Sequence, residues 1–474
     1  MGLFTLLAAL ALLFLRFEVD GGMLRRDYGF ERLDTEGNVG DRLFLTPYIK
    51  SGQTEKARSL SRVQGLLQPD IESYSGFFTT DEKYGSNMFF WFFPAQSGDP
   101  NAPVLLWLQG GPGATSLFGL FSEIGPLALT ADLKAIHMNV TWNSQYALLF
   151  IDNPVGVGFS FTGSQEGYAT NEEDVAMGLY SCLTQFFQVF SDYQKNDFYL
   201  TGESYAGKYL PAIAYKIHTE NPSATVKINL TGISIGDGFC NPGEMVQAYA
   251  EYLNQIGLID SKQALYFAMQ ADLAASHIKN GDYHTAFDIF DFLMNGDIYP
   301  YSTYLANITG GINYDNYLET LAPADMGYYW KYVNLDTTRL AIHVGNQTFD
   351  GGVMCEKMLI NDVMASNVPW IETVFSSYKT LLYNGQLDII VAAPLTTRFL
   401  GHLEWNGRNA FDVAPRSVWH SGNDVAGYAK TVNVTGQPLF HHVILRNAGH
   451  IVPHDQPEWA LDMLTRFIEE KPYN

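Results

Sequence analysis

Cysteine and positive charge are both scarce in this chain of 474 residues. Its three cysteines, Cys182, Cys240 and Cys355, are too few for a disulfide scaffold, and their odd number leaves at least one thiol unpaired within a monomer. The chain has 50 acidic residues against 28 lysines and arginines, for a formal charge of -22 at pH 7. Such a protein repels nucleic acids and anionic membrane surfaces, so we expect neither as a partner.

The cysteines that are present fit structural roles better than catalysis. Cys182 lies in an apolar stretch with helical spacing, where a small core residue is expected. Cys240 and Cys355 are candidates for a disulfide across a lid, although spacing alone does not determine connectivity. A cysteine nucleophile is disfavoured, because none of the three follows a strand in a turn with a basic side chain nearby.

No apolar run long enough to cross a membrane follows the first residues of the chain. The run at residues 3–15 is too short for a span and lies where a secretory signal has its apolar region, so residues 1–22 are predicted to be a signal peptide. We expect a secreted or lysosomal protein, and the sequence pI of about 4.8 fits an acidic compartment. Five glycosylation sequons support this secretory route, at Asn139, Asn229, Asn307, Asn346 and Asn433.

Short apolar runs separated by helical patterns dominate the rest of the chain, as in a parallel sheet buried by helices. Between residues 241 and 370 this rhythm stops, and helix-like spacing rich in Tyr and Phe replaces it. We therefore predict a doubly wound α/β core at 75–240 and 371–474, a helical cap inserted at 241–370, and an N-terminal arm or propeptide at 23–74. The predicted strands are 104–108, 147–151, 197–200, 230–235, 379–383 and 442–445.

The sequence Gly-Glu-Ser-Tyr-Ala-Gly at residues 202–207 lies between an apolar run and a helical pattern. A sharp turn at such a junction exposes the serine hydroxyl as a nucleophile, which makes Ser204 the candidate. The match to G-x-S-x-G is imperfect, because Ala206 replaces the last glycine and Gly207 comes one residue late. Alone, a serine among small residues is usually only a turn.

A second glycine-rich loop, Gln-Gly-Gly-Pro-Gly at residues 109–113, follows the first predicted parallel strand. Glycine lets backbone N–H groups approach a reacting atom closely. We predict an oxyanion hole formed by the N–H groups of Gly111 and of Tyr205, the residue after the nucleophile. A phosphate-binding loop is disfavoured, because neither G-x-G-x-x-G nor a following Lys-Ser/Thr is present.

An acid and a histidine follow later strands. Asp388 and Asp237 both come just beyond a strand and can orient an imidazole, but Asp237 lies in a Gly-Asp-Gly turn, so Asp388 is favoured. Among the histidines, His450 directly follows a strand and is the favoured partner of Ser204, with His454 as the second candidate. His441 and His442 lie at the strand's start and are interpreted as surface or structural residues. The chain order Ser, Asp, His is typical of α/β-hydrolases, with a mostly parallel sheet and helices on both faces.

These motifs together resemble the serine carboxypeptidase family. The resemblance covers most of the chain from about residue 75 and rests on residues 107–113, 154–160, 202–207, 383–388 and 448–453. Gln109 and residues 341–347 make the chain most similar to the vitellogenic carboxypeptidase-like branch. The resemblance implies the triad Ser204, Asp388 and His450.

The resemblance also implies a site for the substrate's C-terminal carboxylate, formed by Gln109, Gly110, Glu203 and Glu123. An acid binds a carboxylate only while it carries a proton, and two packed carboxyls share one because both cannot easily ionise. Peptidase activity is therefore expected to be best in acid. Gln109 replaces the family's usual Asn and is one methylene longer. Without the resemblance, Glu203 is a first-turn acid favoured by the helix dipole and Glu123 a surface acid.

The favoured hypothesis is a serine-type exopeptidase that acts on peptide or protein C-termini through an acyl-enzyme, with no metal and no organic cofactor. Acyl transfer or ester hydrolysis on the same triad is the second hypothesis, since a triad specifies acyl chemistry but not the acceptor. A non-catalytic, yolk-associated binding protein is the third, and only Gln109 favours it. A monomer and a homodimer are both compatible with the sequence.

Overall fold

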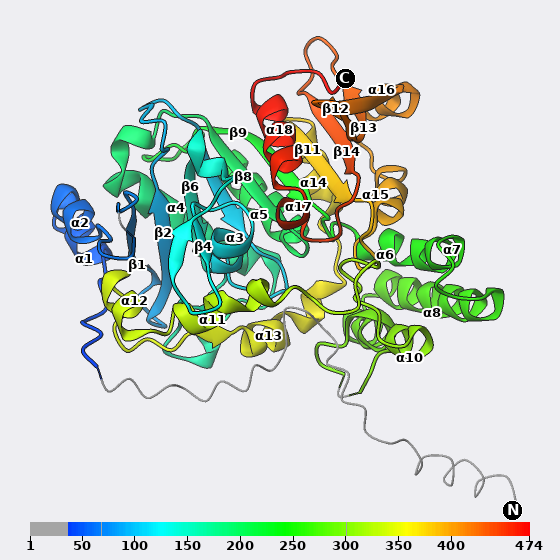
Figure 1. Cartoon of the computed structure of the whole chain (residues 1–474), viewed down its shortest axis with the longest axis horizontal. Coiled ribbons are helices and arrows are strands. Elements are labelled where there is room, and N and C mark those ends of the chain that lie inside the picture. Colours follow the sequence, from blue (N-terminus) through cyan, green and yellow to red (C-terminus); the bar gives the residue numbers. More distant parts are fainter. Residues whose placement is uncertain (1–36, 68, 300) are drawn as a thin grey trace, which may run out of the picture.

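A large mixed sheet forms the centre of the molecule (Figure 1). The computed structural model describes residues 37–67, 69–299 and 301–474, so the expected signal peptide and residues 23–36 of the expected arm lie outside the described residues. Within that part of the chain the sheet has ten strands, in the order β1-β2-β6-β3-β8-β9-β11-β14-β13-β12. Their bounds are β1 (Tyr74–Asp81), β2 (Ser86–Phe93), β3 (Val104–Leu108), β6 (Ala147–Ile151), β8 (Phe198–Glu203), β9 (Leu230–Gly236), β11 (Lys379–Gly385), β12 (Arg416–Ser421), β13 (Asp424–Val432) and β14 (Phe440–Leu445).

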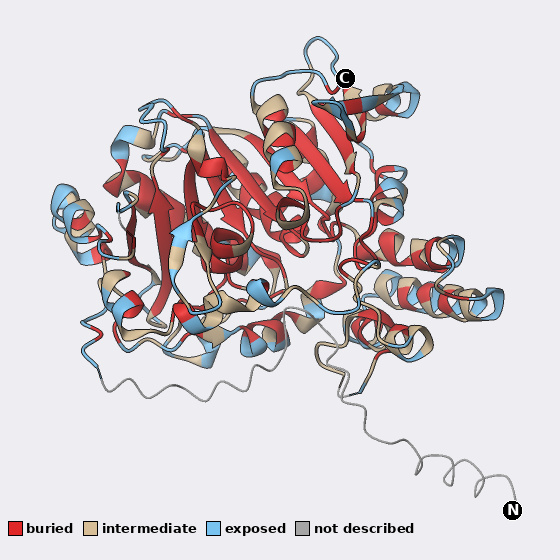
Figure 2. Ribbon diagram, viewed as in Figure 1, coloured by how far each residue is buried: buried red, intermediate tan, exposed pale blue. Residues whose placement is uncertain are grey.

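The strands from β6 to β14 in this order are parallel, and two antiparallel strands flank them at each edge. The six parallel strands are the six that the sequence predicts. Burial on both faces explains their continuous apolar runs. In β3, Leu106 and Leu108 belong to one hydrophobic cluster, whereas Leu105 and Trp107 belong to another on the opposite face. Figure 2 shows the central strands buried along their length.

Helices cover both faces of the sheet, which confirms the predicted α/β architecture. Residues of α4, α5 and α14 share a core cluster with Leu106, and residues of α3 and α18 share the other with Trp107. The helices are α1 (Thr46–Lys50), α2 (Thr54–Leu60), α3 (Leu117–Ser122), α4 (Glu172–Val189), α5 (Ala206–Glu220), α6 (Pro242–Met245), α7 (Tyr249–Gln255), α8 (Ser261–Lys279), α9 (Tyr283–Phe290), α10 (Tyr304–Thr309), α11 (Tyr328–Tyr332), α12 (Asp336–Ala341), α13 (Val353–Val363), α14 (Val368–Phe375), α15 (Ala393–Leu400), α16 (Arg408–Val413), α17 (Val452–Asp455) and α18 (Pro457–Ile468).

Between β9 and β11 the chain adds no strand to the large sheet. It forms α6 to α14, together with the two-residue strand β10 (Asp350–Gly351), which pairs with β7 (Val157–Gly158). Helices α7, α8 and α10 lie at the lower right in Figure 1. Phe287 and Phe290 of α9 belong to the core cluster that contains α5, so this helical segment is packed onto the sheet domain.

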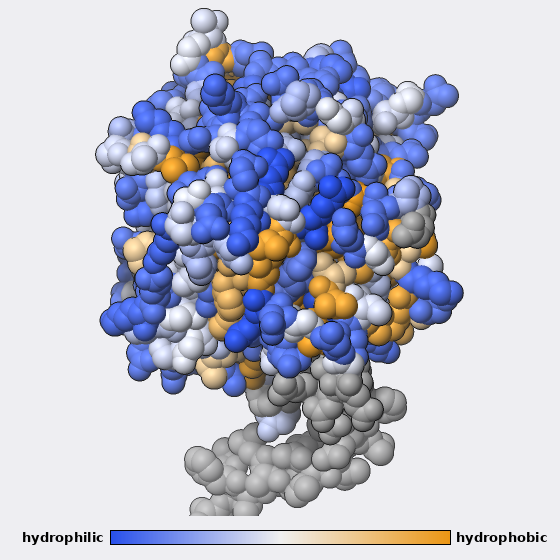
Figure 3. Space-filling view, turned by 90° about the vertical axis from the view of Figure 1, so that its left-hand side faces the viewer, coloured by the Kyte–Doolittle hydropathy of each residue, from blue (hydrophilic) through white to orange (hydrophobic). Residues whose placement is uncertain are grey.

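The segment before β1 is also packed. Leu45 and Ala57 of the α1–α2 region are fully buried in the core cluster that contains α4. No helix among the described residues is long and apolar enough to cross a membrane. The face seen in Figure 3 is mostly hydrophilic, with hydrophobic residues gathered near its middle.

Candidate active site

Ser204 lies in a tight turn between β8 and α5. Its φ of 63° is in the left-handed region, which a non-glycine residue adopts only when its surroundings hold it there. The Ser204 N–H donates to the carbonyl of Gly236 at 2.9 Å, and the Ser204 carbonyl accepts from Phe239 at 3.0 Å. A Cβ at Gly207 would lie 2.8 Å from Gly238, whereas Ala206 is accommodated. The glycine that the turn needs is therefore the late one, and the departure from G-x-S-x-G is explained.

His450 and Asp388 form a buried pair. The His450 Nδ1–H donates to Asp388 Oδ2 at 2.9 Å, a tautomer that leaves Nε2 as the basic nitrogen. Asp388 Oδ1 accepts the N–H of Val391 at 3.1 Å, and the His450 N–H donates to the carbonyl of Asp315 at 2.6 Å. Both members of the pair are thus held from two sides, Asp388 in the turn after β11 and His450 in the loop after β14.

The charges around His450 favour its protonated form. Burial alone lowers the pKa of His450, but Asp388, Asp315 and Glu203 outweigh it and raise that pKa to about 9. Burial raises the pKa of Asp315 to about 7 and that of Glu203 well above its usual range. In acid these two carboxyls are neutral, so only Asp388 then opposes the effect of burial. The His450 imidazole therefore loses its proton more easily in acid than a pKa of about 9 suggests.

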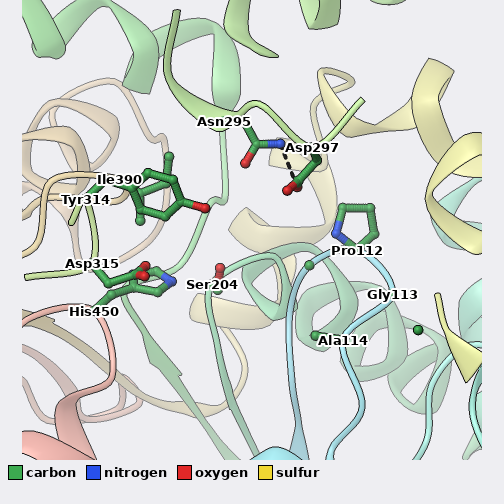
Figure 4. Close-up of a pocket in the computed structure, with 12 residues that line it drawn as sticks. Pro112, Gly113, Ala114, Ser204, Asn295, Asp297, Tyr314, Asp315, Ile390 and His450 are labelled. Atoms are coloured by element: carbon green, nitrogen blue, oxygen red, sulfur yellow. Dashed lines mark hydrogen bonds between the residues drawn. The ribbon is translucent and has the colours of Figure 1, made fainter. Parts of the chain in front are cut away.

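Ser204 and His450 line one cavity of about 50 Å³. In Figure 4 the Ser204 hydroxyl lies between the His450 ring and the loop at residues 112–114. The segment between β9 and β11 supplies Asn295, Asp297 and Tyr314 above Ser204 in Figure 4, and Asp315 beside the His450 ring. No sequence motif marks these residues. Asp315 is 5% exposed, and its Oδ2 accepts no hydrogen bond from any described residue.

The glycine-rich loop after β3 lies directly against the nucleophile turn. A Cβ on Gly110 would be 2.5 Å from the Tyr205 nitrogen and 2.7 Å from the Ser204 Cβ, so only glycine fits there. Gly111 has a φ of 107° and lines the cavity. Among the described residues none accepts a hydrogen bond from the N–H of Gly111 or of Tyr205. These two N–H groups are available to a ligand.

Two glutamates lie together below this turn. Glu203 is fully buried at the end of β8, and Glu123, which follows α3, is 3% exposed. Their carboxyl groups face one another, and two carboxyls can hydrogen-bond only if they share a proton. Burial is the main cause that raises the pKa of Glu123 to about 8, and burial followed by the charge of Glu123 raises that of Glu203 well above its usual range.

Gln109 connects this pair to the sheet. Its Nε2 donates to Glu203 Oε1 at 2.6 Å, and its Oε1 accepts the Trp107 indole N–H at 2.9 Å. The amide is 1% exposed, and the two bonds fix its orientation. Its length is therefore needed to reach from the indole to the carboxyl.

The rival histidines lie elsewhere. His454 contacts Asp455 and Asp325, at 3.2 and 3.5 Å. His442 bonds Asn384 and His441 bonds Thr431. Both are buried and not on the surface, and burial lowers the pKa of each to about 4. They are structural residues of β14.

The cysteine predictions have mixed outcomes. Cys182 is a fully buried core residue of α4, as predicted. The pairing of Cys240 with Cys355, which the sequence left open, does not occur, because none of the three thiols, all of which lie in the described part of the chain, forms a disulfide. Cys240 follows β9 in the turn below α5, and Cys355 lies in α13; both are packed into the core without a covalent link.

Asp237, the rival acid, lies against the favoured one. Its carboxyl is fully buried and faces that of Asp388. One donor or acceptor atom from each of Asp237, Asp388 and His450 lies within 4.8 Å of the others. The structure thus brings both acids to the histidine, and the 2.9 Å bond to His450 belongs to Asp388.

Residues 64–470 match the family described as serine carboxypeptidase, Peptidase S10. The chain belongs to the serine carboxypeptidase family. Its enzyme class is therefore that of a serine-type carboxypeptidase, a hydrolase.

Relatives extend along almost the whole chain. Probable serine carboxypeptidase CPVL of Homo sapiens is 48% identical over 456 residues, which cover 96% of this chain and 95% of that one. Venom serine carboxypeptidase of Apis mellifera is 46% identical over 440 residues, 92% of this chain and 93% of that one. Vitellogenic carboxypeptidase of Aedes aegypti is 39% identical over 438 residues, which cover 92% of this chain and 91% of that one.

A solved structure shares the fold. Kex1(delta)p, a prohormone-processing carboxypeptidase from Saccharomyces cerevisiae, matches with a TM-score of 0.72 and 22% sequence identity. The match covers 87% of this chain and 96% of that one. With the sheet described above, it confirms the predicted α/β-hydrolase fold.

Proposed function

We propose that the protein removes the C-terminal residue of peptides and proteins through an acyl-enzyme. Ser204 Oγ attacks the last peptide carbonyl while His450 Nε2 takes its proton and Asp388 holds the imidazole. The N–H groups of Gly111 and Tyr205 stabilise the oxyanion. The C–N bond then breaks, the imidazolium gives its proton to the leaving amine, and a water activated by the same imidazole hydrolyses the acyl ester.

The buried carboxyl pair beside the nucleophile is the observation that carries this proposal. We assign Glu203, Glu123, Gln109 and the N–H of Gly110 to the substrate's C-terminal carboxylate. Protonated Glu203 can donate to that carboxylate, with Glu123 sharing its proton and Gln109 fixing its orientation. An ester or an internal peptide bond offers no such group, so the pair favours a carboxypeptidase over a general esterase.

Buried acids also support activity and residence at acidic pH. Burial raises the pKa of Glu123 and Glu172 to about 8 and of Asp152 and Asp315 to about 7. Each of these groups is neutral in acid and must ionise in a desolvated site as the pH rises. The carboxylate site loses its proton over the same range.

A route through the secretory pathway to a lysosomal or secreted location fits these properties. All five sequon asparagines are exposed, so each can accept a glycan: Asn139, Asn229, Asn307, Asn346 and Asn433. The relative from Apis mellifera is named a venom enzyme. Expression in a secretory host, followed by glycosidase treatment and N-terminal sequencing, tests glycosylation and signal removal together.

Three matched substrates test the reaction itself. Wild type and Ser204→Ala are assayed from pH 4 to 8 on an N-blocked dipeptide, its C-terminal amide and the corresponding ester. We expect the free acid to be preferred in acid and Ser204→Ala to be inactive. Equal cleavage of acid and amide contradicts a carboxypeptidase, and preference for the ester or for transfer to an added amine favours the acyl-transfer alternative.

A further inference from the structure

The carboxyl that holds His450 is itself contacted by a second buried carboxyl. Asp237 follows β9 and Asp388 follows β11, which are neighbouring parallel strands. Asp237 Oδ1 accepts the Gly385 N–H at 3.0 Å and the Asn384 Nδ2–H at 3.3 Å. Among the described residues no donor reaches its Oδ2. The carboxyl of Asp237 lies against that of Asp388, and two carboxyls can hydrogen-bond only if one of them carries a proton.

The proton belongs on Asp237. Both oxygens of Asp388 already accept N–H groups, Oδ2 from His450 and Oδ1 from Val391. In the described part of the chain, Gly385 and Asn384 are the donors to Asp237, and both bond the same oxygen. Burial, followed by the charge of Asp388, raises the pKa of Asp237 well above its usual range.

The remaining charged and titratable groups that face this pair do not reverse the assignment. When they are ionised, Glu203 on β8 raises the pKa of Asp237 and Asp315 raises that of His450. His442 on β14 reaches Asn384, but burial keeps the imidazole neutral by lowering its pKa to about 4. The Tyr252 hydroxyl donates to the Asp388 carbonyl, and the fully buried Tyr383 precedes Asn384 on β11.

We propose that Asp237 carries a proton, donates it in a hydrogen bond to Asp388, and acts as a positioning residue that weakens the hold of Asp388 on the His450 proton. A donor to Asp388 disperses its negative charge and fixes its carboxyl plane, so the imidazolium is less stabilised. His450 then stays a usable base at a lower pH. The inference rests on the proposed triad but not on the proposed carboxylate site.

Two substitutions separate a protonated Asp237 from an ionised one. Asp237→Asn keeps a neutral donor of the same shape, and asparagine tolerates the φ of 42° at this position. Asp237→Gly removes the donor, and glycine also tolerates that φ. The full chain is inactivated with an organophosphonate that has no free carboxylate, from pH 4 to 9.5, and the midpoint of the rate profile reports His450. Melting temperatures show that each variant is folded.

We expect an unchanged midpoint for Asp237→Asn and an upward shift of about one unit for Asp237→Gly. If Asp237 were ionised, Asp237→Asn would remove a negative charge within 4.8 Å of the imidazole and lower the midpoint by about 1–3 units. That result, or an unmoved midpoint for Asp237→Gly, overturns the inference. Failure of wild-type Ser204 to react would count against the proposed function, and NMR titration of the His450 ring in the same variants would still decide the role of Asp237.

Discussion

Replacing Glu172 by Gln is expected to stabilise the protein at neutral pH and to leave its stability in acid unchanged. Glu172 begins α4, is 1% exposed and lies outside the proposed active site. Burial raises its pKa to about 8, an effect that the charge of Lys208 reduces and that of Asp362 increases. Since the folded pKa is raised, the stability contribution is full below the ordinary value of 4.5 and is lost as the pH rises to about 8.

The magnitude follows from the size of that interval. Each pH unit between the ordinary pKa of 4.5 and the folded pKa of about 8 lowers the free energy of unfolding by about 1.4 kcal/mol, so the whole interval lowers it by up to about 5 kcal/mol. The amide that replaces the carboxyl in Glu172→Gln is neutral at every pH and does not incur this cost.

Urea unfolding of both proteins at pH 5, 6, 7 and 8 measures the difference. Glu173→Gln, the next residue and an exposed one, is the matched control. We expect the stability gap between Glu172→Gln and wild type to be small at pH 5 and to grow by about 1.4 kcal/mol per unit. A gap that stays constant with pH, or equal growth in the control, would refute the reasoning.

Three further substitutions test the site. Glu123→Leu removes a member of the proton-sharing pair, so kcat/KM on a free-acid dipeptide is expected to fall about 10- to 100-fold. The variant should cleave the C-terminal amide of the same dipeptide at the wild-type rate. An equal loss of kcat/KM on both substrates would contradict the assignment. Asp315→Asn removes a charge that raises the pKa of His450, so the midpoint of the pH profile for organophosphonate inactivation should lie at lower pH than in wild type. A midpoint at higher pH than in wild type would refute this. Gln109→Asn cannot bond both Trp107 and Glu203, so urea unfolding should show a loss of about 1–3 kcal/mol, and unchanged stability would mean that the long amide is not needed.

The central strands could be predicted because burial on both faces leaves a local signal, a short apolar run before a polar turn. The hairpin of β1 and β2 was not predicted, although β2 is buried at every residue. The hairpin joins two strands without a helix between them, so the alternation of apolar runs with helical patterns did not indicate it. Pro211 lies inside α5, and the helix nevertheless continues to Glu220. Both faces of that segment are buried, and packing offsets the lost hydrogen bond.

The site residues that the motifs indicated are those that follow parallel strands, because such loops meet at one edge of the sheet. Asp315 had no such signal. It comes from the helical segment between β9 and β11, and its place beside His450 depends on tertiary packing. Asp237 and Asp388 were treated as rivals, since the sequence does not show that β9 and β11 are neighbours. Pairing of these strands is what places both carboxyls together.

The central claim is that a protonated Glu203–Glu123 pair selects substrates with a free C-terminal carboxylate. Its most direct test is the ratio of kcat/KM for an N-blocked dipeptide to that for the C-terminal amide of the same dipeptide, measured from pH 4 to 9. The account predicts a ratio well above one in acid that falls towards one as the pH rises through about 8, where Glu123 loses its proton. A ratio near one at every pH, or one that rises with pH, would contradict it.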